Sequence, residues 1–145
     1  MIVALLICYN LIMNTIKMKE VSAVILRVGI ALVVMWFGYQ QFTNPEMWMK
    51  MLPDWTKSFP ISQINFIYVN AWFEMIFGTL LFLGLFTRFV AFLVALHLFH
   101  IMFTVGYGGV GVRDFGLALG AVSIFFYGSS MWSLDMLFSQ KTKLS

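Results

Sequence analysis

The sequence predicts an all-α protein, an integral membrane four-helix bundle with a short amphipathic segment in its first outer loop. Two observations carry this prediction. Of the 145 residues, 61% are hydrophobic and only 10% are charged, whereas soluble domains carry about 25% charged residues. Four stretches are each about 20 apolar residues long, the length that a helix needs to cross a bilayer. A soluble chain this short could not bury so much apolar surface, so we expect lipid to surround it.

The four membrane segments are separated by polar or helix-breaking residues. Asn44-Pro45 and Pro53 interrupt the first loop, and Thr87-Arg88 forms a polar corner after Gly84. Glycines after residue 105 loosen the end of the third segment. We therefore expect the segments at about Val21–Phe42, Phe66–Leu85, Phe89–Val110 and Asp114–Met131.

The first residues are apolar but do not form a further span. Met1–Ile12 is too short to cross a bilayer and lacks the basic start and cleavage site of a signal peptide. It is either an extension from a misassigned start, with Met13 or Met18 as the initiator, or an interfacial segment. We expect an N-terminal extension over residues 1–20, a four-helix domain over 21–137 and a cytoplasmic tail over 138–145.

The distribution of basic residues predicts the orientation. Five lie on one side of the expected segments (Lys17, Lys19, Arg88, Lys141 and Lys143) and three on the other (Lys50, Lys57 and Arg113). The side richer in Lys and Arg is normally cytoplasmic. We therefore expect a plasma-membrane protein with both termini in the cytoplasm.

The first outer loop, Thr43 to Gln63, carries apolar residues at helical intervals: Met47, Trp48, Met51, Leu52 and Trp55. This spacing is typical of a short amphipathic helix lying on the membrane surface. The segment is either a membrane-anchored lid without chemistry or a hydrophobic gate over a cavity between the helices.

Polar side chains inside the apolar segments are the candidate functional residues. Glu74 lies about 12 Å below the outer end of its helix, near the middle of the membrane, where a carboxylate must be paired, hydrated or protonated. We expect Glu74, Arg27, His97 and His100 to form one buried cluster. The alternatives are an Arg27–Glu74 ion pair that only fixes helix register, and a metal or haem shared by the two histidines.

A site that binds a quinone headgroup needs only one or two hydrogen-bonding groups in an apolar pocket. We assign Glu74 and His100 as the proton-handling residues of such a site, and Arg27, His97, Gln41 and Asn70 as headgroup-binding residues. No metal site is predicted. Cys8 is the only cysteine, which excludes an internal disulfide and a CxxC redox centre. No phosphate-binding loop, nucleophile elbow or long basic run is present, so a nucleic-acid partner is not expected.

Other residues have structural interpretations. Gly116 and Gly120 form a Gly-x-x-x-Gly pattern that lets helices approach closely. Arg88 is expected to anchor the topology at the cytoplasmic corner. Arg113 and Asp114 are expected to cap the fourth helix, and Asp135 a short C-terminal turn.

Several short motifs resemble the DoxX/DoxD family. They are Leu26-Arg27, Gly38 to Phe42 with Pro45, Glu74 with Gly78, Gly84 and Thr87-Arg88, Arg113-Asp114, and Gly128 with Ser133-Leu134-Asp135. The resemblance covers about Val21 to Leu137 and implies a small four-helix membrane protein. Some members resemble the small subunit of thiosulfate:quinone oxidoreductase, and others are named as terminal oxidase subunits. Gln41 stands where the family usually carries Lys, so the carry-over rests on Arg27, Glu74, Arg88, Arg113 and Asp114.

The resemblance implies an accessory or quinone-facing subunit of a membrane redox system, at most one subunit of a quinone-linked oxidoreductase. Quinone is the one cofactor that it suggests. The expected partners are the lipid bilayer, a redox partner subunit and a second copy of the chain. The alternatives are a non-enzymatic scaffold or assembly subunit and a permeation path for a small molecule.

Overall fold

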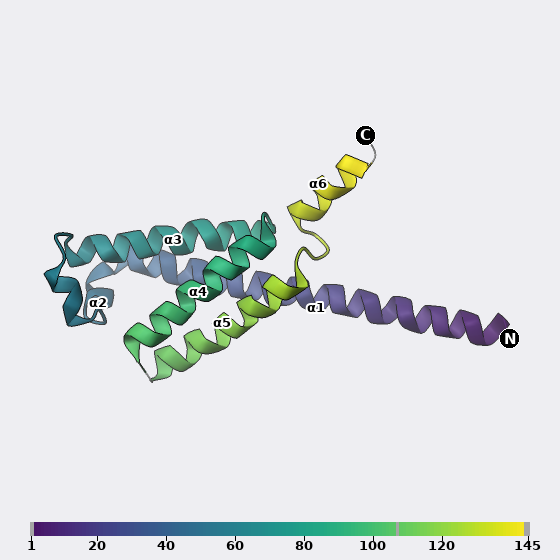
Figure 1. The fold of residues 1–145 in the computed structure, drawn as a ribbon, viewed down its shortest axis with the longest axis horizontal. Helices are drawn as coiled ribbons and strands as arrows, with labels where there is room; N and C mark the ends of the chain where they lie inside the picture. Colours follow the sequence, from purple (N-terminus) through teal and green to yellow (C-terminus); the bar gives the residue numbers. More distant parts are fainter. Residues whose placement is uncertain (1, 107, 144–145) are drawn as a thin grey trace.

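The computed structural model describes residues 2–106 and 108–143, with side chains described over 11–106 and 108–140. These residues form helices and connecting turns, with no strand among them (Figure 1). The elements are α1 (Ile2–Thr43), α2 (Pro45–Met49), the 3₁₀ helix η1 (Asp54–Ser58), α3 (Gln63–Leu83), α4 (Thr87–Val105), α5 (Gly109–Tyr127) and α6 (Leu134–Lys143).

Four of these helices are long and apolar enough to cross a membrane, over Leu11–Thr43, Gln63–Leu83, Thr87–Val105 and Gly109–Tyr127. The predicted fold class is confirmed, and the chain is an integral membrane protein. The helix boundaries differ from those expected by a few residues at most ends and by more at three of them. Gly106, at φ +80°, ends α4 before Val110, and α5 already begins at Gly109. α1 runs on from Ile2 without a break because no Gly or Pro occurs before Gly29.

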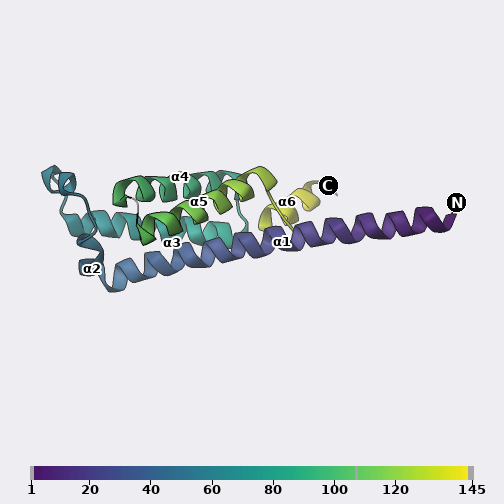
Figure 2. The same cartoon turned by 90° about the horizontal axis from the view of Figure 1, so that it is seen from below.

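The spanning helices pack as two antiparallel pairs, α1 with α3 and α4 with α5 (Figures 1 and 2). Their core is made of small and branched apolar side chains such as Ala31, Val34, Leu81, Val94 and Ala121. Small residues at such contacts let helix backbones approach in lipid, where apolar burial gives little driving force. The N-terminal part of α1 projects beyond the bundle (Figure 2).

The bundle has two different ends. The α2 end carries α2, η1 and the turn between α4 and α5, and the terminal end carries the α3–α4 turn, residues 128–133 and α6 (Figure 1). The first turns of α1 lie in the same direction as α6, opposite to α2. The first turns of α1 and α6 therefore lie on one side of the bundle, while a place in the cytoplasm stays a prediction from charge.

Arg27 holds the terminal end together. Its side chain is 1% exposed, and Nη1 donates to the carbonyls of Leu81 (3.1 Å) and Phe82 (2.8 Å). Nη2 donates to the Trp132 carbonyl at 3.1 Å. The expected pairing of Arg27 with Glu74 is therefore wrong, since Glu74 lies seven residues, about 10 Å, before Leu81 on α3. The last carbonyls of α3 lack helical partners and lie at the negative end of its dipole, which suits a cation.

Asp135 caps α4 from a distant part of the chain. Its Oδ1 accepts from the Phe86 N–H, and Oδ2 accepts from the Thr87 N–H, both at 2.8 Å. The Thr87 hydroxyl also donates to Oδ2, and the Asp135 N–H donates to the Gly84 carbonyl. The carboxylate thus satisfies N–H groups at the start of α4, whereas we expected it to cap a turn in its own segment.

Only one of the two glycines in the Gly-x-x-x-Gly pattern lies at a close contact between helices. A Cβ at Gly120 would lie 2.6 Å from Cδ1 of Ile30, so α5 approaches α1 closely there. A Cβ at Gly116 would have no atom within 4 Å, because this residue is on the exposed face of α5. The expected helix contact therefore exists at Gly120 and not at Gly116.

Candidate functional site

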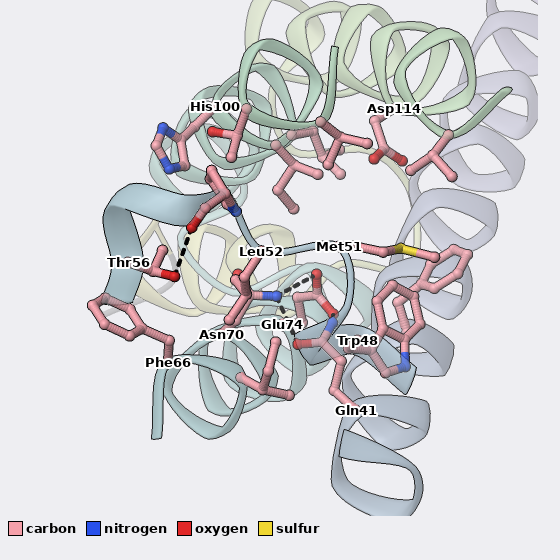
Figure 3. A pocket seen from close by; sticks show the side chains of 18 of the residues that line it. Gln41, Trp48, Met51, Leu52, Thr56, Phe66, Asn70, Glu74, His100 and Asp114 are labelled. Atoms are coloured by element: carbon pink, nitrogen blue, oxygen red, sulfur yellow. Dashed lines mark hydrogen bonds between the residues drawn. The ribbon is translucent and has the colours of Figure 1, made fainter. Parts of the chain in front are cut away.

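A buried polar network lies near the α2 end, between α1 and α3. Gln41 Nε2 donates to Glu74 Oε2 at 2.6 Å, and Asn70 Nδ2 donates to Glu74 Oε1 at 3.1 Å. Asn70 Nδ2 also donates to Gln41 Oε1 at 2.7 Å, which closes the network (Figure 3). Glu74 is 3% exposed, so its carboxylate depends on these two amides in place of water.

Local sequence spacing explains this placement. Asn70 and Glu74 are four residues apart on α3 and therefore share one face. Gln41 is buried in the last turns of α1, which pack against the first half of α3 because the two helices are antiparallel. Three residues that we assigned to the site from the sequence, Gln41, Asn70 and Glu74, thus come together.

His97 reaches the same carboxylate from α4. Its Nε2 lies 3.5 Å from Glu74 Oε1, and its ring lies 4.3 Å from the ring of Phe73, centroid to centroid. This distance exceeds the usual 2.7–3.2 Å, so the contact is weaker than those of the two amides. His97 and Glu74 therefore form the part of the expected cluster that the structure brings together.

The network borders a cavity of ≈ 170 Å³. Figure 3 shows Glu74, Asn70 and Gln41 on one side of this space and Asp114 on the other, with its carboxylate pointing into it. The remaining walls are mostly apolar and come from all four spanning helices and from the α2–η1 segment. They include Val34, Phe66, Ile67, Leu98, Ile101, Val110 and Leu117.

The pair Arg113–Asp114 forms the wall opposite Glu74. Arg113 Nε donates to Asp114 Oδ1 at 2.7 Å, and the guanidinium carbon lies 4.0 Å from the centre of the Phe37 ring. Asp114 is 1% exposed, and its Oδ2 has no hydrogen-bond partner in the described part of the chain. The expected capping role is wrong, because α5 begins at Gly109 and Asp114 lies in its second turn.

His100 borders the cavity at its rim. The side chain is exposed and lies beside η1, apart from the carboxylate of Glu74 (Figure 3). His97 and His100 therefore have different surroundings. The described residues hold no group of three or more His, Cys, Asp or Glu arranged for a metal.

The first loop covers the cavity. Trp48 of α2 packs edge-on against Phe37, with ring centres 5.7 Å apart. Thr56 of η1 is buried, where its hydroxyl donates to the Pro53 carbonyl at 2.7 Å and accepts from Gln63 Nε2 at 3.1 Å. The expected amphipathic segment is thus two short helices, split around Pro53, that together lie over the site.

Two of the predicted residues lie away from this cavity. Arg27 is at the terminal end, and so is Arg88, whose Nε would lie 2.6 Å from a Cβ placed on Gly128. Sequence reasoning missed Asp114 as a cavity residue. An acid within an apolar segment was the available signal, but the expected start of α5 at Asp114 made it look like a cap.

The hydrogen-bonding capacity of the cavity is mixed. Both N–H groups of Asn70 are used, while one N–H of Gln41 Nε2 has no partner among the described residues. Asp114 Oδ2 is a free acceptor. A ligand with an acceptor at one end and a donor at the other, or with groups that interconvert between the two, would satisfy both walls.

The comparisons with known proteins identify one family. The DoxX family matches residues 22–106, which include Gln41, Asn70, Glu74 and His97 and exclude Arg113 and Asp114. The comparisons with curated proteins and with solved structures found no match. With more than half of its length matched, and with four spanning helices, the chain belongs to the DoxX family of membrane proteins.

Proposed function

We propose that the cavity at the α2 end binds the headgroup of a membrane quinone, and that this protein is a quinone-facing accessory subunit of a membrane redox system. The observation that carries the proposal is the Gln41–Asn70–Glu74 network, buried between spanning helices and bordering a partly open cavity. A polar network of this kind in lipid is costly unless it serves a ligand or a partner helix.

The size of the cavity suits a single ring. An apolar cavity of about 150 Å³ admits benzene, and this one measures ≈ 170 Å³. A quinone ring would fill it, with the tail leaving past the exposed rim at His100 toward lipid. α2 and η1, which carry Trp48 and Thr56, would then shield the ring from water.

The chemistry of the walls suits both forms of a quinone. The oxidised ring presents carbonyl acceptors, for which the free N–H of Gln41 is a donor. The reduced ring presents hydroxyl donors, for which Asp114 Oδ2 is an acceptor. Glu74 would hold a proton taken from a bound hydroxyl, and His100 at the rim would exchange it with the surroundings. Gln41 and Asn70 would bind the headgroup, and Arg27, which we first assigned to this role, would not.

The test is direct binding of a short-chain benzoquinone to the full chain in nanodiscs, followed by quenching of tryptophan fluorescence. Trp48 and Trp55 border the cavity and report on its occupancy. We expect saturable quenching that Glu74→Gln weakens about tenfold, because the network around the ring is rearranged. Glu46→Gln, an exposed substitution at the same end, should bind like wild type.

Three results would count against the proposal. Quenching that does not saturate in the wild type would exclude a quinone site. Equal quinone affinity of the wild type and Glu74→Gln would show that the network is not part of the quinone site. Co-purification of a stoichiometric partner without quinone binding would favour the scaffold.

A further inference from the structure

A second cavity lies at the terminal end, between α1 and the end of α5, and measures ≈ 650 Å³. It is separate from the quinone cavity, and the proposed function does not use it. Its polar lining includes Lys19, Arg27 and Ser130. Leu26 and Ile124 contribute an apolar wall.

Two of the residues that line this cavity carry buried polar atoms without partners. Arg27 and Ser130 are each 1% exposed, and both Arg27 Nε and Ser130 Oγ lack a hydrogen bond in the described part of the chain. The Nη atoms of Arg27 are engaged with three carbonyls, so Nε is its one idle nitrogen. A buried donor without a partner destabilises the fold, so a ligand acceptor that reached either atom would be favourable.

Lys19 adds a cation on the same side of α1. It lies eight residues, about 12 Å, before Arg27, and this spacing keeps both side chains on one helix face. The neighbouring acids are already engaged. Glu20 accepts the Met131 N–H at 2.8 Å, and Asp135 accepts the N–H groups of Phe86 and Thr87. Neither acid lines the cavity, whose charged lining residues are Lys19 and Arg27, so the charge at its wall is positive.

The depth of the cavity matches the boundary of the bilayer. Arg27 is level with Leu81 and Phe82, in the last turn of the α3 span. The end of a spanning helix lies near the headgroup region of a bilayer, so a lipid in this cavity would place its phosphate near Arg27 and its acyl chains along Leu26 and Ile124. We propose that this cavity binds a phosphate group presented by an anionic phospholipid, with Arg27, Lys19 and Ser130 as donors.

The experiment measures thermal unfolding of the detergent-solubilised full chain with three additives: dioleoyl phosphatidylglycerol, dioleoyl phosphatidylcholine and inorganic phosphate. We expect phosphatidylglycerol to raise Tm by at least about 3 °C, and the other two additives to raise it by less than half as much. Lys19→Gln and Ser130→Ala should each halve the shift. Arg27 is left intact because it also caps α3, and Lys50→Gln at the α2 end should keep the full shift.

Each alternative outcome overturns a defined part of the proposal. An equal shift with phosphatidylcholine would show that the anionic headgroup is not recognised. An equal shift with inorganic phosphate would show that the source is free phosphate and not a lipid. An undiminished shift in both Lys19→Gln and Ser130→Ala would place the lipid elsewhere. Native mass spectrometry of the same variants, counting retained phosphatidylglycerol, checks the result without relying on stability.

Discussion

At the scale of the residue, the side-chain amides of Gln41 and Asn70, and not a cation, stabilise the buried carboxylate of Glu74. Gln41 and Asn70 each donate to a different carboxylate oxygen, and Asn70 also bonds to Gln41, so the three side chains fix one another. Hydrogen bonds to a charged group are stronger than neutral ones, about 1.5–3 kcal/mol each. This arrangement tolerates loss or gain of a proton on Glu74 better than a buried ion pair would, because no second charge is left alone.

Removing the amide of Gln41 should destabilise the bundle. Gln41→Leu keeps the volume but leaves Glu74 Oε2 without its 2.6 Å donor, for an expected loss of about 1–3 kcal/mol. Thermal unfolding in nanodiscs measures the loss. Gln40→Leu is the matched control, since the Gln40 side-chain oxygen accepts from exposed Asn44 and lies outside the network. Equal melting temperatures for the two variants would contradict the role of the network.

Two glycines of the chain should respond to substitution in opposite ways. Gly84 has φ +68°, and a Cβ there would meet the Arg27 guanidinium and Ser133, so Gly84→Ala should cost about 1–3 kcal/mol or more. Gly116→Ala meets open space within a helix and should be neutral, or stabilising by up to about 1 kcal/mol. Unfolding of both variants under one condition tests the contrast, which a loss of similar size in each would refute.

At the scale of the element, contacts far apart in the sequence fix the helix ends. α4 begins where Asp135 supplies the acceptors for its first N–H groups, and α3 ends where Arg27 accommodates its last carbonyls. At the other end, α2 and η1 are only five residues long each. The contact of Trp48 with Phe37 and the hydrogen bond of buried Thr56 hold them in place. The terminal end is therefore fixed by charges and the α2 end by packing.

Loss of the α4 cap should be measurable. Asp135→Ala removes acceptors from Phe86 and Thr87 and should lower the stability by about 0.5–2 kcal/mol. Asp54→Ala, which breaks only the exposed ion pair with Lys57, should change little. Chemical unfolding of both variants decides the point, and comparable losses would mean that Asp135 does not act as a cap.

The loop over the cavity should loosen when its buried hydroxyl is removed. Thr56→Val keeps the shape of the side chain but loses the bonds to Pro53 and Gln63. We expect faster hydrogen exchange over residues 52–62 and unchanged exchange in α5. Ser58→Ala, on the exposed part of η1, serves as the control, and identical exchange in the two variants would argue against Thr56 as the anchor.

At the scale of the whole molecule, two antiparallel helix pairs make a bundle whose ends differ in chemistry. Four crossings return the chain to the side from which it started, so α6 lies at the end toward which the first turns of α1 project (Figure 1). The proposed quinone site and the proposed lipid site thus lie at opposite ends of the bundle. Occupancy of one need not alter the other, since different contacts hold them.

This topology predicts the labelling of substituted cysteines. In a Cys8→Ser background, Lys57→Cys in η1 should react with a membrane-impermeant reagent from one side of sealed vesicles, and Lys141→Cys only from the other. The excess of Lys and Arg predicts that residue 141 is cytoplasmic. Labelling of both cysteines from the same side would contradict the bundle, and labelling with the sides exchanged would contradict only the orientation.

The sequence by itself determined the solvent, the number of crossings and the polar face that carries Gln41, Asn70 and Glu74. Hydropathy over 20 residues and spacing along one helix are local quantities, so they can be read without the fold. The partners of the charged groups were decided by the tertiary structure alone. Arg27 bonds to Trp132 across 105 residues and Asp135 to Phe86 across 49, because helix ends expose carbonyl and N–H groups that any nearby charge can satisfy. The partner of a buried charge depends on which helix ends lie next to it in the fold. Residue spacing along the sequence does not specify this.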